Sequence, residues 1–223
     1  MKLAIKKPTI IALVAVALLI LGAIGFRAIF GSEYAEPTAD ALRFKASYEE
    51  LNGQPVSADQ PDPIWQEIHI PERNPFRFTD YDEIIDLLER RGTAVVYLGF
   101  PNCSWCRNLV PVLADAAIDF GVEEILYRNI SNDHDILQHS SLAPLHNALN
   151  SSPPHRISAP TVLFIQDGEI IHSQGNLQSF SSRVEHAPLG GFTPMNDSEI
   201  RELSYLFKAY FARLFHYPDS DEE

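Results

Sequence analysis

Hydrophobic and polar positions follow two periods along the chain, and these periods predict strands and helices. Residues 93–100 (TAVVYLGF) are a continuous apolar, β-branched run, which is typical of a strand covered on both faces. Residues 161–166 and 169–173 flank an Asp-Gly turn and predict a hairpin. Apolar residues at helical spacing predict helices elsewhere. The remaining predicted elements are strands over residues 64–70 and 124–130, and helices over residues 39–51, 79–92, 103–120, 135–149 and 200–215.

The order of these elements predicts an α/β fold. Strands alternate with helices until a terminal hairpin and helix, so we expect a central sheet of mixed direction flanked by helices. Two helix ends carry clear signals. Thr79 is the expected N-cap of the helix over residues 79–92, and Gly121 is expected to end the helix over residues 103–120.

The chain begins with a long apolar run. Residues 10–26 (IIALVAVALLILGAIGF) contain no charged residue and would span ~26 Å as a helix, close to the hydrocarbon thickness of a bilayer. Three lysines precede the run, which predicts a single-pass transmembrane signal anchor with a cytoplasmic N-terminus. A cleaved signal peptide is the alternative, because residues 23–25 (AIG) offer a small-x-small cleavage site. Either interpretation places the soluble part outside the cytoplasm.

We expect four parts along the chain. Residues 32–75 are polar, acidic and interrupted by prolines, and we interpret them as a stalk or linker with an N-terminal extension, whose helix can dock on the domain. The predicted parts are a cytoplasmic tip and transmembrane anchor (1–31), this stalk (32–75), a globular domain (76–217) and an acidic tail (218–223).

Composition narrows the classes of function. The chain of 223 residues is 45% hydrophobic and 21% charged, which fits a globular domain rather than a disordered one. Its net charge of −13 argues against nucleic acid as a partner, because phosphate binding needs a basic face. The two cysteines, Cys103 and Cys106, are too few for a disulfide scaffold.

The two cysteines form a CxxC pair at the expected start of a helix. At this spacing they can close a small disulfide ring, and the positive end of the helix dipole, together with nearby Arg107, favours a thiolate at Cys103. A thiolate is the form that attacks a disulfide. Cys103 is therefore the expected nucleophile, and Cys106 is the expected resolving thiol that releases the mixed disulfide.

Two other interpretations of the pair compete with a redox role. A zinc site would need two more ligands; His134 and His139 lie downstream with close ligand spacing, but there is no second CxxC. A buried, inert pair conflicts with a strand-to-helix junction, which is a surface position. We expect a redox pair with no metal and no cofactor. Trp105, between the cysteines, is either an exposed contact for a client protein or a cover for the sheet edge.

Two segments resemble thioredoxin-like proteins. They are residues 97–117 (YLGFPNCSWCRNLVPVLADAA) and residues 157–171 (ISAPTVLFIQDGEII). Pro111 stands where the family has a proline that kinks the active-site helix, and Ala159-Pro160 looks like the family's cis-proline segment. The resemblance implies a thioredoxin-like sheet, a proline packed against the disulfide, and a backbone before Pro160 that pairs with bound peptide. Within the family, the pattern looks most like secreted, membrane-tethered members of Gram-positive bacteria, which include bacteriocin transport accessory proteins.

The chain also departs from the family pattern. Tyr97 stands where thioredoxin has a buried aspartate that assists proton transfer to the resolving thiol. Ser104-Trp105 replaces Gly-Pro between the cysteines, and Ala159 replaces a more common threonine or isoleucine. These departures leave the direction of electron flow open. Residues 175–198 form an extra length before the last helix, and we expect them to border the active site.

These observations predict an extracytoplasmic thiol–disulfide oxidoreductase that acts on protein disulfides. The expected partners are exported client proteins or a redox partner protein, and the N-terminal helix is expected to hold the protein in the cell membrane. A non-catalytic peptide-binding or chaperone module for exported proteins is the first alternative. A metal-binding thiol protein is the second.

Overall fold

The computed structural model describes residues 36–133, 142–148, 159–171 and 194–215. The chain divides into two compact units, residues 1–37 and 38–223, and nearly all described residues belong to the second. The predicted anchor, the acidic tail and most of the long segment before the last helix lie outside the described residues.

A five-stranded sheet forms the centre of the described part of the chain. Its order is β3 (Phe76–Phe78), β5 (Ile125–Asn129), β4 (Ala94–Gly99), β6 (Thr161–Gln166) and β7 (Glu169–Ile170). The first three strands in this order are parallel, and β6 and β7 are antiparallel to their neighbours. The mixed central sheet predicted from the sequence is confirmed.

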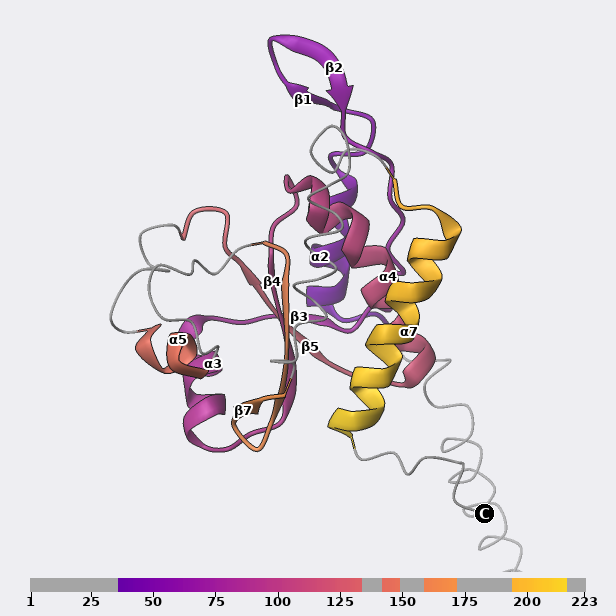
Figure 1. The fold of residues 1–223 in the computed structure, drawn as a ribbon. Coiled ribbons are helices and arrows are strands. Elements are labelled where there is room, and N and C mark those ends of the chain that lie inside the picture. Colours follow the sequence, from indigo (N-terminus) through magenta and orange to yellow (C-terminus); the bar gives the residue numbers. More distant parts are fainter. Residues whose placement is uncertain (1–35, 134–141, 149–158, 172–193, 216–223) are drawn as a thin grey trace, which may run out of the picture. The chain divides into compact units, whose positions relative to one another are not determined.

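Helices cover both faces of this sheet. Figure 1 shows α2 (Ala39–Glu49), α4 (Ser104–Phe120) and α7 (Asp197–Leu214) on one face, and α3 (Tyr81–Glu89) and α5 (Ala143–Ala148) on the other. The buried side chains divide in the same way into two apolar clusters, one on each side of the sheet. Alternation along β4 sends Tyr97 to the cluster beneath α2, α4 and α7 and Leu98 to the other cluster.

The helix ends follow from capping side chains. Cys103 is the N-cap of α4, and Gly121 ends that helix in the left-handed conformation with φ 83°, as predicted. The prediction that Thr79 caps α3 is wrong. Asp80 is the N-cap, because its carboxylate accepts from the Glu83 N–H at 2.9 Å, whereas the Thr79 hydroxyl bonds the Glu83 side chain.

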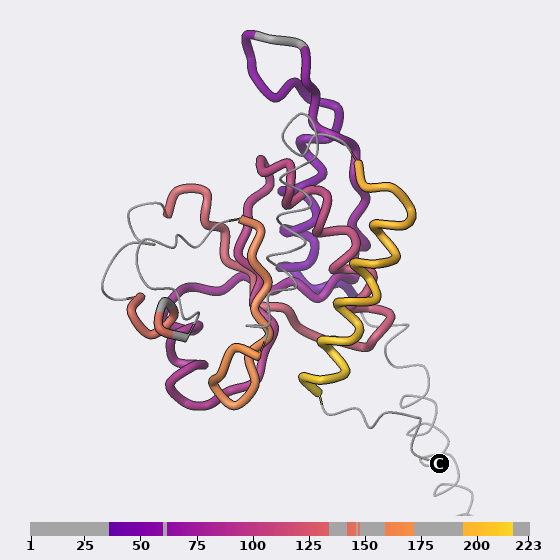
Figure 2. Tube along the Cα trace, in the orientation of Figure 1, coloured from indigo at the N-terminus to yellow at the C-terminus, as the bar shows by residue number. Residues whose placement is uncertain are grey.

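The strand predicted over residues 64–70 is also wrong. The strand in this region is β2 (Gln60–Ile64), which pairs with β1 (Pro55–Ser57) in a hairpin that projects from the rest of the unit (Figure 2). Residues 65–70 run past α2 without joining a strand ladder. Side chains bond part of this backbone instead: Asn52 bonds both the N–H and the carbonyl oxygen of Ile68.

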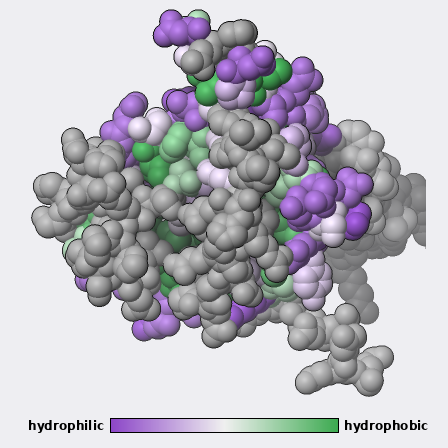
Figure 3. Space-filling view, turned by 45° about the horizontal axis from the view of Figure 1, so that its top comes forward, coloured by the Kyte–Doolittle hydropathy of each residue, from purple (hydrophilic) through white to green (hydrophobic). Residues whose placement is uncertain are grey.

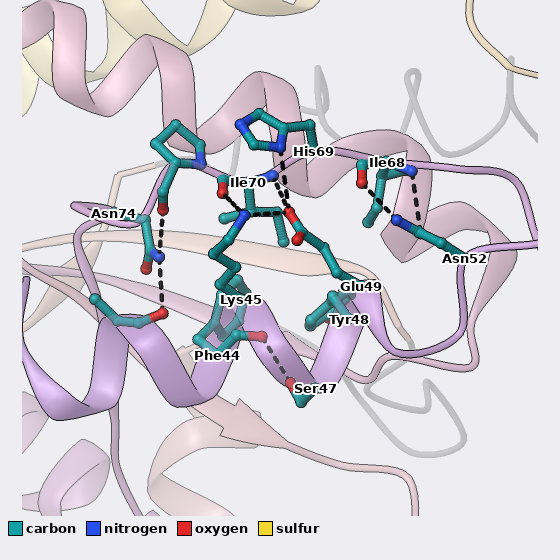
Figure 4. Close-up of polar contacts among 12 residues, drawn as sticks. Phe44, Lys45, Ser47, Tyr48, Glu49, Asn52, Ile68, His69, Ile70 and Asn74 are labelled. Atoms are coloured by element: carbon teal, nitrogen blue, oxygen red, sulfur yellow. Dashed lines mark hydrogen bonds and ion pairs between the residues drawn. The ribbon is translucent and has the colours of Figure 1, made fainter.

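Part of the expected stalk belongs to the compact unit. Phe44 and Tyr48 of α2 are fully buried, and the Phe44 ring stacks on Phe76 of β3 at a centroid distance of 3.9 Å. Polar contacts fix the other side of α2 (Figure 4): Lys45 donates to the Ile70 carbonyl oxygen at 2.7 Å, and Glu49 accepts from the Ile70 N–H at 2.7 Å. The helix predicted over residues 39–51 is thus part of the core.

The described surface carries both hydrophilic and hydrophobic residues (Figure 3). Its exposed large hydrophobic side chains are Leu42, Ile64, Ile118, Ile200, Tyr205 and Phe215. Within the described residues, no helix is both long and apolar enough to cross a membrane, and the apolar run at residues 10–26 falls outside them.

Candidate active site

The CxxC pair lies where β4 leads into α4. Because Cys103 is the N-cap, its backbone is extended and its side chain turns back over the first turn, where the sulfur accepts a hydrogen bond from the Cys106 N–H at 3.2 Å. The Cys103 N–H in turn donates to the Phe100 carbonyl oxygen at 3.3 Å. The turn therefore presents the first sulfur to the unpaired N–H groups at the start of the helix.

The surface position predicted for the cysteine pair is wrong, because both cysteines are buried, but the two thiols differ in exposure. Cys103 keeps an exposed fraction of 7%, whereas Cys106 has none. A disulfide that approaches from solvent therefore meets Cys103 first. This difference matches the roles predicted for the two cysteines, which remain predictions.

The two thiols also differ in acidity. The hydrogen bond with the Cys106 side chain lowers the pKa of Cys103; burial opposes this, and the N–H groups of Cys106 and Trp105 add to the lowering. Burial raises the pKa of Cys106 well above its usual range, and the neighbouring Cys103 raises it further. Cys103 is the thiol that ionises first.

The Ala159–Pro160 segment lies beside the first sulfur. The peptide bond between these residues is cis, and Pro160 directly precedes β6. Strand register explains the proximity, because Thr161 of β6 pairs with Leu98 near the end of β4. The Cys103 thiol donates to the Ala159 carbonyl oxygen at 3.9 Å. The structure thus brings together two segments that lie more than fifty positions apart in the chain.

The structure does not single out a role for the other candidate residues, Trp105, His134 and His139. Trp105 is half-buried and packs against the apolar cluster, a position that allows both of its predicted roles. His134 and His139 lie outside the described residues. Within the described residues, no group of three or more metal-ligating side chains is close enough to hold an ion.

The predicted effect of Arg107 on the nucleophile needs correction. Arg107 is fully buried and turns toward the N-terminal segment, where it donates to the Tyr48 carbonyl oxygen at 2.6 Å and to the Gln66 carbonyl oxygen at 2.7 Å. The groups that lower the pKa of Cys103 are the hydrogen bonds at the helix start. Arg107 instead fixes the N-terminal segment against α4.

Sequence reasoning missed one residue of the site, Tyr48 of α2. Its hydroxyl lies 2.9 Å from the hydroxyl of Tyr97. Burial raises the pKa of the Cys106 thiol, and Tyr97 partly opposes that rise. In the sequence, Tyr97 stands out only as a departure from the family pattern. The helical spacing of Phe44 and Tyr48 indicated a buried face, but nothing in the sequence indicated which strand that face covers.

Comparisons with known proteins add little to this geometry. No protein-family model and no curated protein matches the chain. Among solved structures, thioredoxin O2 from Arabidopsis thaliana in its oxidized state is similar, with 16% sequence identity and a TM-score of 0.29, over 52% of this chain and 96% of that one. A TM-score this low carries no argument, and none of these comparisons supports the bacteriocin transport subgroup.

Proposed function

We propose that the protein is a thiol–disulfide oxidoreductase that exchanges electrons with protein disulfides through Cys103 and Cys106. One observation carries the proposal: the Cys103 thiol, of lowered pKa and 7% exposed, caps a helix directly beside the fully buried Cys106 thiol of raised pKa. Such asymmetry suits a nucleophile and a resolving thiol, because the thiolate is the reactive species.

In the reducing direction, exchange has two steps. The Cys103 thiolate attacks one sulfur of a client disulfide, which forms a mixed disulfide and releases the other client sulfur as a thiolate. Cys106 then loses its proton and attacks Cys103, so that a Cys103–Cys106 disulfide forms and the second client thiolate leaves. Two electrons pass from the protein dithiol to the client. A dithiol reductant returns the pair to its reduced state, and every step runs backward in the oxidising direction.

The backbone around Ala159 and Pro160 supports a place for the client. The Ala159 carbonyl oxygen accepts a hydrogen bond from the Cys103 thiol. A peptide that brings a disulfide to this sulfur therefore approaches the backbone of Ala159 and Pro160. Trp105 supplies a half-buried apolar surface next to the pair. We assign client contact to Trp105, Ala159 and Pro160.

We further propose that the domain works outside the cytoplasm, held to the cell membrane by residues 10–26, on exported client proteins or a redox partner protein. The apolar run and the lysines before it support this location. Its test is a membrane-impermeant thiol reagent added to intact cells: labelling of Cys103 supports the location, and labelling only after lysis contradicts it. Membership of the bacteriocin transport accessory subgroup stays a prediction from the sequence.

Reduction of insulin disulfides by dithiothreitol tests the activity. The wild-type chain should accelerate the reaction, and Cys103→Ser and Cys106→Ser should each abolish the acceleration. A protein that binds unfolded clients equally well with or without its cysteines, and never accelerates the reduction, would instead be the peptide-binding module. Titration of the pair against glutathione then gives the preferred direction of exchange.

A further inference from the structure

The β1–β2 hairpin has no packing partner within the described residues. Among the described side chains of residues 55–64, Val56 is half-buried and the others are exposed, and none of them belongs to either apolar cluster. Ile64 keeps an exposed fraction of 50%. A two-stranded hairpin by itself is only marginally stable in water, so this one depends on its attachment to the rest of the unit.

Backbone hydrogen bonds close the base of the hairpin. The Trp65 N–H donates to the Gln54 carbonyl oxygen at 2.8 Å, and the Gly53 N–H donates to the Trp65 carbonyl oxygen at 3.1 Å. Trp65 itself is buried. From this base, the five residues of β2 carry the tip of the hairpin roughly 15 Å outward. We call residues 55–64 the arm.

The base of the arm is bonded to the first turns of α4, beside the cysteine pair. Arg107 donates to the Asn52 side-chain oxygen at 2.5 Å and to the Gln66 carbonyl oxygen at 2.7 Å. The Gln66 side-chain amide donates to Asn108 Oδ1 at 3.0 Å. Figure 1 shows the arm extending from the end of the unit at which α4 begins. A protein that brings a disulfide to Cys103 therefore approaches the end that carries the arm.

The arm and its base carry acidic side chains without basic partners. Residues 50–67 contain no lysine, arginine or histidine, and their four acidic residues are Glu50, Asp59, Asp62 and Glu67. All four are exposed. Within the described part of the chain, none of these carboxylates forms an ion pair, whereas Asp119, also exposed, pairs with a lysine. Unpaired carboxylates of one sign attract a positively charged partner.

The prolines of β2 favour recognition through side chains rather than through an added strand. Pro61 and Pro63 have no N–H to donate to a further strand, which limits pairing along β2. A second copy of the chain is therefore poorly suited to extend this two-stranded sheet.

We propose that the arm binds a basic segment of the client protein while the client disulfide reacts at Cys103. This inference rests on the proposed function, and it adds a charged contact to the apolar one assigned to Trp105. Pro63 and Ile64, both exposed, supply apolar contacts beside Asp62 for the same segment. Clients without a basic segment still react, but more slowly, because the exchange itself needs only the cysteine pair.

Two disulfide-bonded peptides test the charge preference. They share the sequence around the disulfide and differ in one flanking segment, which is rich in lysine in one peptide and in glutamate in the other. The reduced, full-length protein should reduce the lysine peptide about fivefold faster at low ionic strength, the effect of one or two exposed ion pairs. Added salt should remove the difference. The small, uncharged 2-hydroxyethyl disulfide measures the reactivity of the cysteine pair alone.

Charge reversal tests whether the arm carries the preference. Asp59→Lys combined with Asp62→Lys should abolish the preference and leave the rate with 2-hydroxyethyl disulfide unchanged. Glu89→Lys combined with Glu123→Lys is the matched control. Both glutamates are exposed and lie at the opposite end of the sheet, shortly before β4 and β5 begin. The control makes the same change in net charge, so it should keep most of the preference.

Replacement of the arm by a short glycine link repeats the test without a reversed charge. Gln54 and Trp65 pair across the gap, so the link can close it. This variant should also lose the preference, and melting curves check that each variant folds.

Three results would overturn the inference. They are equal rates with both peptides in the wild type, equal loss of the preference in the two double variants, and a wild-type dimer in sedimentation that only the arm variants dissociate. The last result would assign the arm to a second copy of the chain. Failure of the proposed function looks different, because the wild type would then reduce neither the peptides nor 2-hydroxyethyl disulfide.

Discussion

Arg107 Nη1 donates to the carbonyl oxygen of Tyr48 at 2.6 Å, which joins the helix of the cysteine pair to the N-terminal helix. Arg107 directly follows Cys106, and it also bonds the Gln66 carbonyl oxygen at 2.7 Å. The same tyrosine meets Tyr97 through its side chain. The carbonyl oxygen and the hydroxyl of Tyr48 thus both hold the N-terminal segment at the site.

Arg107→Ala should lower the free energy of unfolding by about 3 kcal/mol, because it removes a buried side chain and leaves two carbonyl oxygens without their donor. Urea denaturation measures the change. Arg90→Ala is the control: Arg90 is largely exposed and pairs with Asp86 one helical turn away, so its loss should cost less than about 0.5 kcal/mol. Equal stability of the two variants would contradict the structural role of Arg107.

Glu49→Gln should destabilise the fold by about 1–2 kcal/mol near neutral pH. Burial alone would raise the pKa of Glu49, but hydrogen bonds from Lys45 and from the Ile70 N–H, with the charge of Lys45, lower it overall. A carboxyl group with a lowered pKa in the folded state stabilises it above the unfolded pKa of about 4.3, and this contribution disappears as pH falls through the folded value.

The stability difference between wild type and Glu49→Gln should therefore be constant above about pH 5 and shrink in acid. Thermal melts across this range measure it. Asp119→Asn is the control, since Asp119 forms an exposed pair with Lys208 and should change stability by less than about 0.5 kcal/mol. A difference that grows as pH falls would contradict the lowered pKa of Glu49.

Alkylation of the reduced protein should report the asymmetry of the thiols. Iodoacetamide at neutral pH should modify Cys103 and leave Cys106 unmodified, because Cys106 is buried and its pKa is raised. The rate at Cys103 should rise with pH and level off below the usual thiol pKa of about 8.5, since a lowered pKa gives more thiolate at each pH below it. Peptide mapping by mass spectrometry identifies the site. Preferential modification of Cys106 would contradict the assigned roles.

Gly168→Ala should cost about 3 kcal/mol, and Gly121→Ala about 1 kcal/mol. Both glycines have positive φ, 77° and 83°, but an added Cβ at Gly168 would collide with the Leu88 carbonyl oxygen and with Arg91 Cα, whereas Gly121 has open space. Because both glycines share the left-handed backbone conformation, the difference between the two losses of stability measures the effect of the collision at Gly168. Equal losses in urea denaturation would show that the turn after β6 is less tightly packed against α3 than described.

Local patterns predicted most of the sheet and the helices around it. The apolar run that became β4, the Asp-Gly hairpin of β6 and β7 and the stop at Gly121 are all short-range signals, and the structure confirms them. β3 was missed, because its three residues have no period of their own and pair only with distant β5. The strand predicted over residues 64–70 was wrong, because side chains rather than a neighbouring strand bond the N–H groups of Ile68 and Ile70.

The site was predictable in part. A CxxC motif at the start of a helix identifies the two reactive cysteines directly. The resemblance to thioredoxin-like proteins indicated Ala159 and Pro160. Tyr48 could not be found, since a tyrosine on an apolar helix face predicts burial but not a contact with a strand 49 positions away. The orientation of Arg107 was equally hidden, because sequence proximity to Cys106 suggested a charge near the sulfur rather than a bond to Tyr48.

Trapping of mixed disulfides is the sharpest test of Cys103 as the attacking thiol. Reduced Cys106→Ser and Cys103→Ser variants are mixed with a protein disulfide, quenched in acid, and examined by non-reducing mass spectrometry. We expect Cys106→Ser to accumulate a mixed disulfide through Cys103 and Cys103→Ser to accumulate almost none. Equal trapping by both variants, or trapping through Cys106 alone, would contradict this role of Cys103.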